Sequence, residues 1–344
     1  MAKFRNKNGK QVEADLVLND GPQLSAGEKI RRFIKSQNGW LFMAPALILM
    51  ILFSFYPIIT AFINAFKNDL DMNGVYNGWG FDNFVHVFRG DTGMAGANFW
   101  QCLVNTLVFT LVSVPMSTLI ALLISVALNS IKALQKAYQT ILFLPYLTNS
   151  LAMGAVFATF FSVIKTGDGT NWGIINTVLG TNIDWLGLGN KWDLGSTISI
   201  PWAKYLVLII YEVWTGLPFK ILILFSALQS INKQYYDAAK VDGASRSTIL
   251  WRITAPMISP QISYLLVTGI MGGMKQYTAV VGLFGANMGV AYDMGTMVGY
   301  IYRYVEGGTP KYGYAYAASL ILFFIIMIIT FINNKITKRH TTYK

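Results

Sequence analysis

Charged residues are scarce in this sequence of 344 residues, in which Asp, Glu, Lys and Arg together make up 12%. Soluble domains carry about 25% charged residues, and 54% of this chain is hydrophobic, so the composition indicates a membrane protein. The one cysteine, Cys102, excludes a disulfide within the chain. Together with His86 and His340 it supplies too few ligands for a structural zinc site, and we assign neither histidine a role.

Signals of two other function classes are also missing. No glycine-rich phosphate loop ends in Lys-Ser or Lys-Thr, so we do not expect the chain to bind ATP in the usual way. The apolar segments hold no paired carboxylates, which argues against a membrane-embedded enzyme. The net charge of +11 would suggest nucleic acid binding in a soluble protein. Here Lys and Arg flank apolar stretches, where they set topology and contact anionic lipid, so we expect no nucleic acid partner.

Six apolar segments are long enough, or nearly so, to cross a bilayer. A hydrocarbon core of about 30 Å requires about 20 helical residues. The first segment contains Pro45 and Pro57, which lipid tolerates when neighbouring groups satisfy the freed backbone. We therefore expect an all-α membrane protein with six transmembrane helices, at about residues 40–66, 103–128, 138–163, 202–228, 257–284 and 312–332. Together they form one domain, 40–334, between polar tails at 1–39 and 335–344.

The distribution of basic residues predicts the orientation of these helices. The tail 1–39, the loops 129–137 and 229–256 and the C-terminal tail hold 18 of the 27 Lys and Arg residues. The alternate connections hold six basic and nine acidic residues, so the positive-inside rule places both termini in the cytoplasm. We expect no cleavable signal peptide, because the first apolar stretch is too long for one. In the outer connections, Trp79, Trp172, Trp185 and Trp192 either anchor at the headgroups or contact an external protein.

The cytoplasmic loop 229–256 carries the most specific pattern in the chain. It predicts two short helices, the first capped by Asn232 and the second by Ser245, with Gly243 in the left-handed position that ends a helix. Four residues fall on one face at helical spacing, namely Ile231, Tyr235, Ala238 and Val241. Two alanines beside an acidic residue favour a helix that packs closely against a partner.

This loop resembles the Glu-Ala-Ala loop of permease subunits in bacterial ABC importers. The matching residues are Asp237, Ala238, Ala239, Gly243, Ile253 and Pro256. Segments 76–84, 105–128, 144–146 and 301–315 look like the carbohydrate branch of that family, of the maltose and glycerol-phosphate type. The resemblance covers nearly everything from Trp40 onward. Two departures are Asp237 where Glu is usual, which shortens the side chain by one methylene, and Ala255 where Leu is usual.

The resemblance implies a type I ABC importer permease fold and a non-catalytic subunit in the bacterial cytoplasmic membrane. In this family the loop forms a coupling helix seated in a groove of the ATP-binding subunit, which assigns ATPase coupling to the six matching residues. The implied partners are a second homologous permease subunit in a heterodimer, two ATP-binding subunits, an extracytoplasmic solute-binding protein, membrane lipids and a sugar or oligosaccharide. The chain itself is expected to hold no cofactor, because ATP and Mg²⁺ bind to the partner subunits.

Charged residues within the spans are candidates for function. A charge at mid-bilayer costs at least about 2.5–3.5 kcal/mol and usually faces a cavity or a partner. Glu212 and Lys275 lie at depths that differ by only about 3 Å at 1.5 Å per residue, so they either form an ion pair or line a pathway, and the two can coexist. Lys220 is expected to snorkel to the cytoplasmic interface and Lys204 to lie at the outer one. Trp214 lines the pathway or packs within the bundle.

The resemblance also implies a substrate pathway. In the maltose-type permease one subunit holds the sugar between its third, fourth and fifth spans. The matching positions are Tyr146, Ser150, Glu212, Gly216, Phe219, Met271, Gly272 and Lys275. An aromatic face with a few polar groups is typical of a small-molecule site. Two alternatives remain open here: a permease for a polar solute other than sugar, and an ion-coupled secondary carrier, for which Glu212 is the one intramembrane acid available.

Overall fold

The computed structural model describes residues 4–5, 11–12, 38–90, 98–131, 135–166, 169–187, 189–194, 198–286, 293–306 and 311–340. The chain divides into two compact units, residues 1–60 and 61–344, and the described residues are mostly helical. The predicted tail 1–39 lies largely outside the described residues. The predicted tail 335–344 is described as far as residue 340, where it continues the last helix.

The first unit contains the N-terminal helices. A short antiparallel ribbon of β1 (Phe4–Arg5) and β2 (Gln11–Val12) precedes α2 (Asn38–Met50), a π-helical turn η1 (Ile51–Phe55) and the first part of α3 (Tyr56–Ala65). The π-helical turn η1 lies just before Pro57, which has no N–H to donate to the Phe53 carbonyl. Residues Phe42–Ala65 are apolar enough to cross a membrane, in agreement with the first predicted span.

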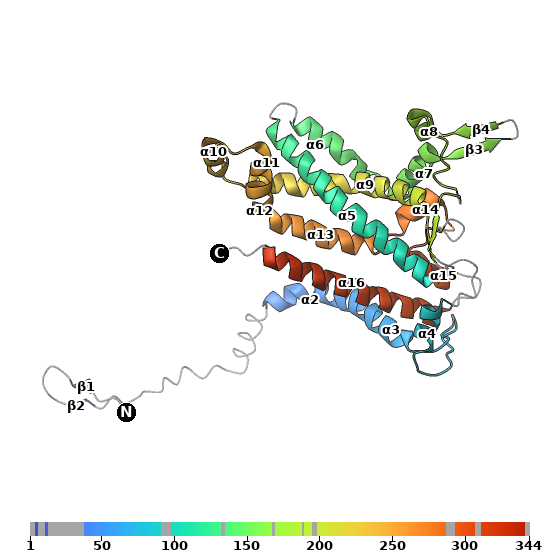
Figure 1. Cartoon of the computed structure of the whole chain (residues 1–344). Helices are drawn as coiled ribbons and strands as arrows, with labels where there is room; N and C mark the ends of the chain where they lie inside the picture. Colours follow the sequence, from blue (N-terminus) through green and yellow to red (C-terminus); the bar gives the residue numbers. More distant parts are fainter. Residues whose placement is uncertain are drawn as a thin grey trace. The chain divides into compact units, whose positions relative to one another are not determined.

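The second unit is a bundle in which α5, α9, α13 and α16 run alongside one another (Figure 1). Its helices are α4 (Asp82–Arg89), α5 (Phe99–Ser130), α6 (Gln135–Phe143), the 3₁₀ turn η2 (Leu144–Leu147), α7 (Ser150–Phe161), α8 (Ile174–Leu179), α9 (Trp202–Gln229), α10 (Lys233–Val241), α11 (Arg246–Ile249), the π-helical turn η3 (Leu250–Thr254), α12 (Ala255–Met257), α13 (Ser259–Gly273), α14 (Thr278–Phe284), α15 (Met297–Glu306) and α16 (Tyr312–His340). Two antiparallel ribbons join β3 (Val163–Thr166) to β4 (Gly169–Trp172) and β5 (Trp192–Leu194) to β6 (Ile198–Ile200).

Four of the six predicted spans are long apolar stretches of helix, and the other two are bent. The four are Phe42–Ala65, Phe99–Ser130, Trp202–Gln229 and Tyr312–Lys335. In the predicted span 138–163, the helices Ala137–Leu147 and Ser150–Phe161 meet at 97°. The chain bends there because Pro145 lies in the 3₁₀ turn. Asn149 then caps a new helix, since its side chain accepts a hydrogen bond from Leu151 N at 2.8 Å. In 257–284 the helix bends by 71° after residue 257 and ends again at Gly273. The 97° bend lies inside the predicted span 138–163, and the break between Gly273 and Thr278 lies inside the predicted span 257–284, whereas the 71° bend lies at the start of that span. The short ribbons correct the all-α expectation.

Close helix contacts in the bundle depend on small residues. Gly154 of α7 meets Gly282 of α14, where a Cβ on Gly154 would lie 2.8 Å from the Gly282 Cα. Gly273 of α13 meets Thr110 of α5, where a Cβ would lie 2.7 Å from the Thr110 side chain. Apolar burial adds little to helix association in lipid, so close packing of this kind carries much of it.

The connections that the sequence predicts to be outer are folded around buried polar side chains. Asn83 of α4 is fully buried and donates to the carbonyls of Ala65 and Lys67 at 2.9 and 2.8 Å, which fixes the connection after α3. Trp185 is 8% exposed and donates through Nε1 to Asn176 Oδ1 at 3.0 Å. Both interpretations given above for Trp185, a headgroup anchor and a docking residue, are therefore wrong, because the side chain belongs to the protein core.

We predict that Gly154→Val destabilises the bundle by about 1–3 kcal/mol, the usual range for overpacking, because its side chain would overlap the Gly282 backbone. Thermal unfolding of the purified transporter measures the effect. Gly189→Ala is the matched control, because a Cβ at Gly189 meets nothing within 4 Å. An unchanged unfolding temperature for Gly154→Val would contradict the close packing of α7 on α14.

Candidate functional site

The two short helices predicted in the loop 229–256 are confirmed, and so are their caps. Asn232 accepts a hydrogen bond from Gln234 N at 3.0 Å at the start of α10. Gly243 has φ of +71°, the left-handed conformation expected of it, and Ala244 N donates to the Ala239 carbonyl at 2.9 Å. Ser245 accepts from Thr248 N at 3.2 Å and starts α11. Both ends of α10 are thus fixed by local hydrogen bonds.

Helix α10 presents its apolar residues to two different sides. Ala239 is buried, whereas Ala238 is exposed. Tyr235 and Val241 are 55% and 89% exposed, and with Ala238 they form an outward face at helical spacing. Ile231 precedes α10 and packs into the bundle, so its predicted place on this face is wrong. The remaining three residues form the apolar surface that a docking partner requires.

The loop is tied back to the next span by contacts that the sequence did not reveal. Thr254 of η3 is buried and donates to the Tyr236 hydroxyl of α10 at 3.4 Å. The predicted coupling residues Ile253 and Pro256 lie in η3 and α12, on the same connection. Asp237 forms an exposed ion pair with Lys240 at 3.5 Å. The Thr254–Tyr236 contact therefore joins α10 to η3.

The predicted pathway residues on α9 lie on one helix face and meet the bend in the third span. Glu212, Gly216 and Phe219 are spaced at i, i+4 and i+7. The Phe219 ring stacks on Tyr146 of η2, with 5.9 Å between ring centroids and an interplanar angle of 16°. The structure thus brings together two aromatic residues that the sequence assigned to the pathway separately.

Ser150, at the start of α7, is held by the neighbouring residue of α9. The Tyr211 hydroxyl donates to the Ser150 carbonyl at 2.7 Å and lies 3.0 Å from Ser150 Oγ. A tyrosine hydroxyl has one hydrogen, so Ser150 Oγ is the donor in the second contact. Ser150 therefore positions the bend, and its hydroxyl hydrogen is already used.

The glycines assigned to the pathway leave open space. A Cβ at Gly216 or at Gly272 would meet no atom within 4 Å, unlike the tightly packed Gly273 beside it. Met271 is half-buried and Lys275 is exposed. Side chains therefore leave the two glycines uncovered, and no contact in the described residues joins Lys275 to the α9 face.

The ion pair predicted between Glu212 and Lys275 is wrong. Glu212 Oε1 instead accepts a hydrogen bond from Gln276 Nε2 at 2.5 Å, and no Glu212–Lys275 ion pair occurs among the described residues. The prediction assumed one helix through residue 284, whereas α13 ends at Gly273 and the chain turns before α14. The turn brings residue 276 to Glu212 in place of residue 275.

Lys220 and Lys204 are both buried. The snorkelling predicted for Lys220 is therefore wrong, whereas the place of Lys204 at the outer interface stays a prediction. Lys220 is 7% exposed, and its Nζ donates to the Val114 carbonyl at 3.2 Å and to Ser117 Oγ. Polar groups of α5 thus replace water around the ammonium. Lys204 is 1% exposed. Trp214 packs on Phe157 with 5.1 Å between ring centroids, which supports packing within the bundle.

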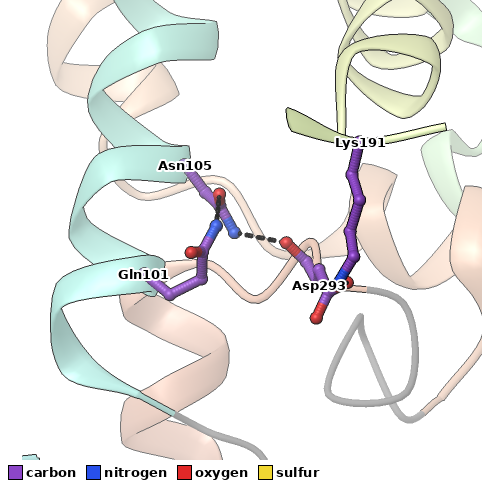
Figure 2. A network of polar contacts seen from close by, with 4 residues as sticks. All are labelled: Gln101, Asn105, Lys191 and Asp293. Carbon is purple, nitrogen blue, oxygen red and sulfur yellow. Dashed lines mark hydrogen bonds and ion pairs between the residues drawn. The ribbon is translucent and has the colours of Figure 1, made fainter. Parts of the chain in front are cut away.

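A second polar network, which sequence reasoning missed, is centred on Asn105 near the start of α5. Asn105 is fully buried, and its Nδ2 donates to the carbonyls of Asp293 and Gly295, both at 2.9 Å. Its Oδ1 accepts from Gln101 Nε2 and the Tyr205 hydroxyl, both at 2.7 Å. Figure 2 shows Gln101 and Asn105 on α5 facing Asp293, which also forms an ion pair with Lys191 at 3.7 Å. The one amide joins α5, α9 and the segment before α15.

We predict that Asn105→Ala destabilises the transporter by about 1–3 kcal/mol for each buried partner left unsatisfied. Thermal unfolding is again the measurement, and Asn182→Ala, at an exposed site, is the control. A stability equal to that of the control would show that the network is not structural.

Comparisons with known proteins agree on one family. The family described as "Binding-protein-dependent transport system inner membrane component" matches residues 94–341. The lactose transport system permease protein LacF of Rhizobium radiobacter is 29% identical over 297 residues, 86% of this chain and 92% of LacF. The arabinooligosaccharides transport system permease protein AraP of Bacillus subtilis is 26% identical and covers 89% of this chain and 90% of AraP. A crystal structure of a bacterial ABC transporter involved in the import of the acidic polysaccharide alginate has a TM-score of 0.69 and 26% identity, covering 92% of this chain and 100% of that chain.

Proposed function

The chain belongs to the binding-protein-dependent transport system inner membrane components, and from this premise we propose that it is one of two permease subunits of an ATP-driven sugar importer. It is a multi-pass membrane protein. We infer six crossings with both termini in the cytoplasm, because the two bent helix pairs add to the four long apolar stretches and the basic residues lie on alternate connections.

The observation that carries this proposal is the capped two-helix loop between α9 and α13. It lies at one end of the second unit, whereas α8, the β3–β4 ribbon and α15 lie at the other (Figure 1). Its outward face of Tyr235, Ala238 and Val241 is apolar and exposed, and it is suited to a groove in a separate ATPase subunit. Rigid-body movement of such a helix passes motion from one protein to another.

Energy is then supplied from outside the chain. Two ATP-binding subunits hold ATP and Mg²⁺, and this chain, which needs no cofactor of its own, receives the motion through Asp237, Ala238, Ala239, Gly243, Ile253 and Pro256. A second, homologous permease completes the translocation path, and an extracytoplasmic binding protein delivers the solute. The relatives that transport lactose and arabinooligosaccharides support a sugar or oligosaccharide as that solute.

The proposed sugar path follows the half-buried face of α9 that carries Glu212, Gly216 and Phe219. The Tyr146–Phe219 stack offers an aromatic surface to a sugar ring, Gly216 and Gly272 leave room, and Glu212, Gln276 and Lys275 supply hydrogen-bonding groups. A mostly apolar site with a few fixed polar groups is the usual construction of a small-molecule site.

We expect Gly243→Pro to abolish ATP-driven uptake into proteoliposomes while the protein remains in the membrane. Proline fixes φ near −65° and cannot adopt the +71° of Gly243, so α10 would lose its end and its orientation. Gly189→Pro, in an outer connection, is the comparison variant. Uptake by Gly243→Pro at the wild-type rate would refute the coupling function of the loop.

Glu212→Ala is expected to weaken substrate affinity by about 10–100-fold, because a hydrogen bond to a charged group contributes about 1.5–3 kcal/mol. Titration of uptake against substrate concentration measures the change. Leu206→Ala, an exposed apolar site on the same helix, is the control. If both variants keep the wild-type affinity, Glu212 does not line the path.

A further inference from the structure

A cavity of about 610 Å³ lies behind the coupling helix, between α10–α11 and the cytoplasmic ends of α5 and α9. This size falls within the range of about 300–1,000 Å³ that is usual for small-molecule sites. Its wall combines apolar residues, among them Val126 and Leu228, with charged residues of the loop. The cavity is separate from the proposed sugar path, since it shares no residue with it.

Helix α10 contributes one complete face to this cavity. Lys233, Asp237 and Lys240 line it at i, i+4 and i+7. The outward residues Tyr235, Ala238 and Val241 do not line it. The outward apolar residues proposed to contact the ATPase and the residues that line the cavity therefore lie on neighbouring faces of one short helix, and of the proposed coupling residues only Asp237 also lines the cavity.

The charges on the cavity wall favour an anion. Lys233, Lys240 and Arg246 stand against a single carboxylate, that of Asp237. Asp237 pairs with Lys240 at 3.5 Å. In the described part of the chain, neither the Lys233 ammonium nor the Arg246 guanidinium has an ion-pair partner. Two cationic side chains at a partly apolar cavity thus remain available for a ligand, and a phosphate monoester carries a charge of about −1.5 to −2 at neutral pH.

We propose that this cavity binds the phosphate group of a small molecule or of a lipid headgroup, through Lys233 and Arg246. Arginine and lysine are the usual binders of phosphate, and the apolar wall accommodates the rest of the ligand. The ligand contacts α10 on one side and the ends of α5 and α9 on the other. It therefore restrains the movement of the coupling helix relative to the bundle. This regulatory effect rests on the proposed function, whereas the binding of the ligand does not depend on it.

The test measures binding to the complete purified transporter in phosphatidylcholine nanodiscs. In one arm the probe is D-glucose 6-phosphate, with D-glucose as its uncharged control. In the other arm the transporter is in vesicles of phosphatidylcholine alone or of equal parts phosphatidylcholine and phosphatidylglycerol, and bound lipid is measured by native mass spectrometry. The variant is Lys233→Gln with Arg246→Gln. Its matched control is Arg252→Gln, because Arg252 is an exposed cation of the same loop that does not line the cavity.

We expect the wild-type transporter to show saturable binding in at least one arm. The double variant is expected to bind with an affinity at least about tenfold lower, because it loses charge-assisted contacts. Arg252→Gln is expected to bind with the wild-type affinity. Binding of glucose 6-phosphate identifies a soluble ligand, and binding of phosphatidylglycerol alone identifies a lipid. The absence of saturable binding in both arms, or equal binding by wild type and the double variant, would overturn the proposal. ATP-driven uptake by the double variant is measured in parallel, so that a failure of the anion site is distinguished from a failure of the transport function.

Discussion

The arrangement of this bundle depends on how polar groups are satisfied where lipid offers no water. Three polar residues of α9 each have a partner on another element: Tyr205 bonds Asn105 of α5, Glu212 bonds Gln276 at the α13–α14 turn, and Lys220 bonds Ser117 of α5. These contacts lie along most of the helix, so α9 is fixed to its neighbours at several depths. The same helix leads directly into the loop 229–256. Under the proposed function, α9 therefore carries motion from that loop into the bundle.

The sequence predicted the local features of the loop well, because they depend on residues close together in the chain. The caps at Asn232 and Ser245 and the left-handed Gly243 follow from side-chain chemistry within a few residues. The bend in 138–163 and the break after Gly273 were not predicted, although Pro145 gave a signal for the first and the adjacent Gly272 and Gly273 for the second. Apolar composition alone cannot distinguish a straight span from two helices that meet at 97°.

The polar partners of the spans could not be predicted, because they depend on contacts between distant segments. Lys220 was expected at the interface since it lies toward one end of its helix, but Ser117, more than a hundred residues earlier, provides its site inside the protein. Glu212 pairs with Gln276 and not Lys275 because the chain turns after Gly273. Asn105 gave no local signal of the four hydrogen bonds that its side chain makes. For the candidate site, the sequence could therefore indicate candidate residues but not the contacts between them.

The central claim is that the outward face of α10 contacts a separate ATPase subunit, and cross-linking tests it most directly. Val241→Cys introduces an 89% exposed thiol on that face, while the native Cys102 is 3% exposed. In the purified complex, a short bifunctional thiol reagent is expected to join Cys at position 241 to an ATPase subunit that carries a cysteine at its docking groove. The control, Ile174→Cys in α8, is expected to give no cross-linked product. No cross-link at position 241, or labelling of that position by an impermeant reagent from outside intact cells, would contradict the account.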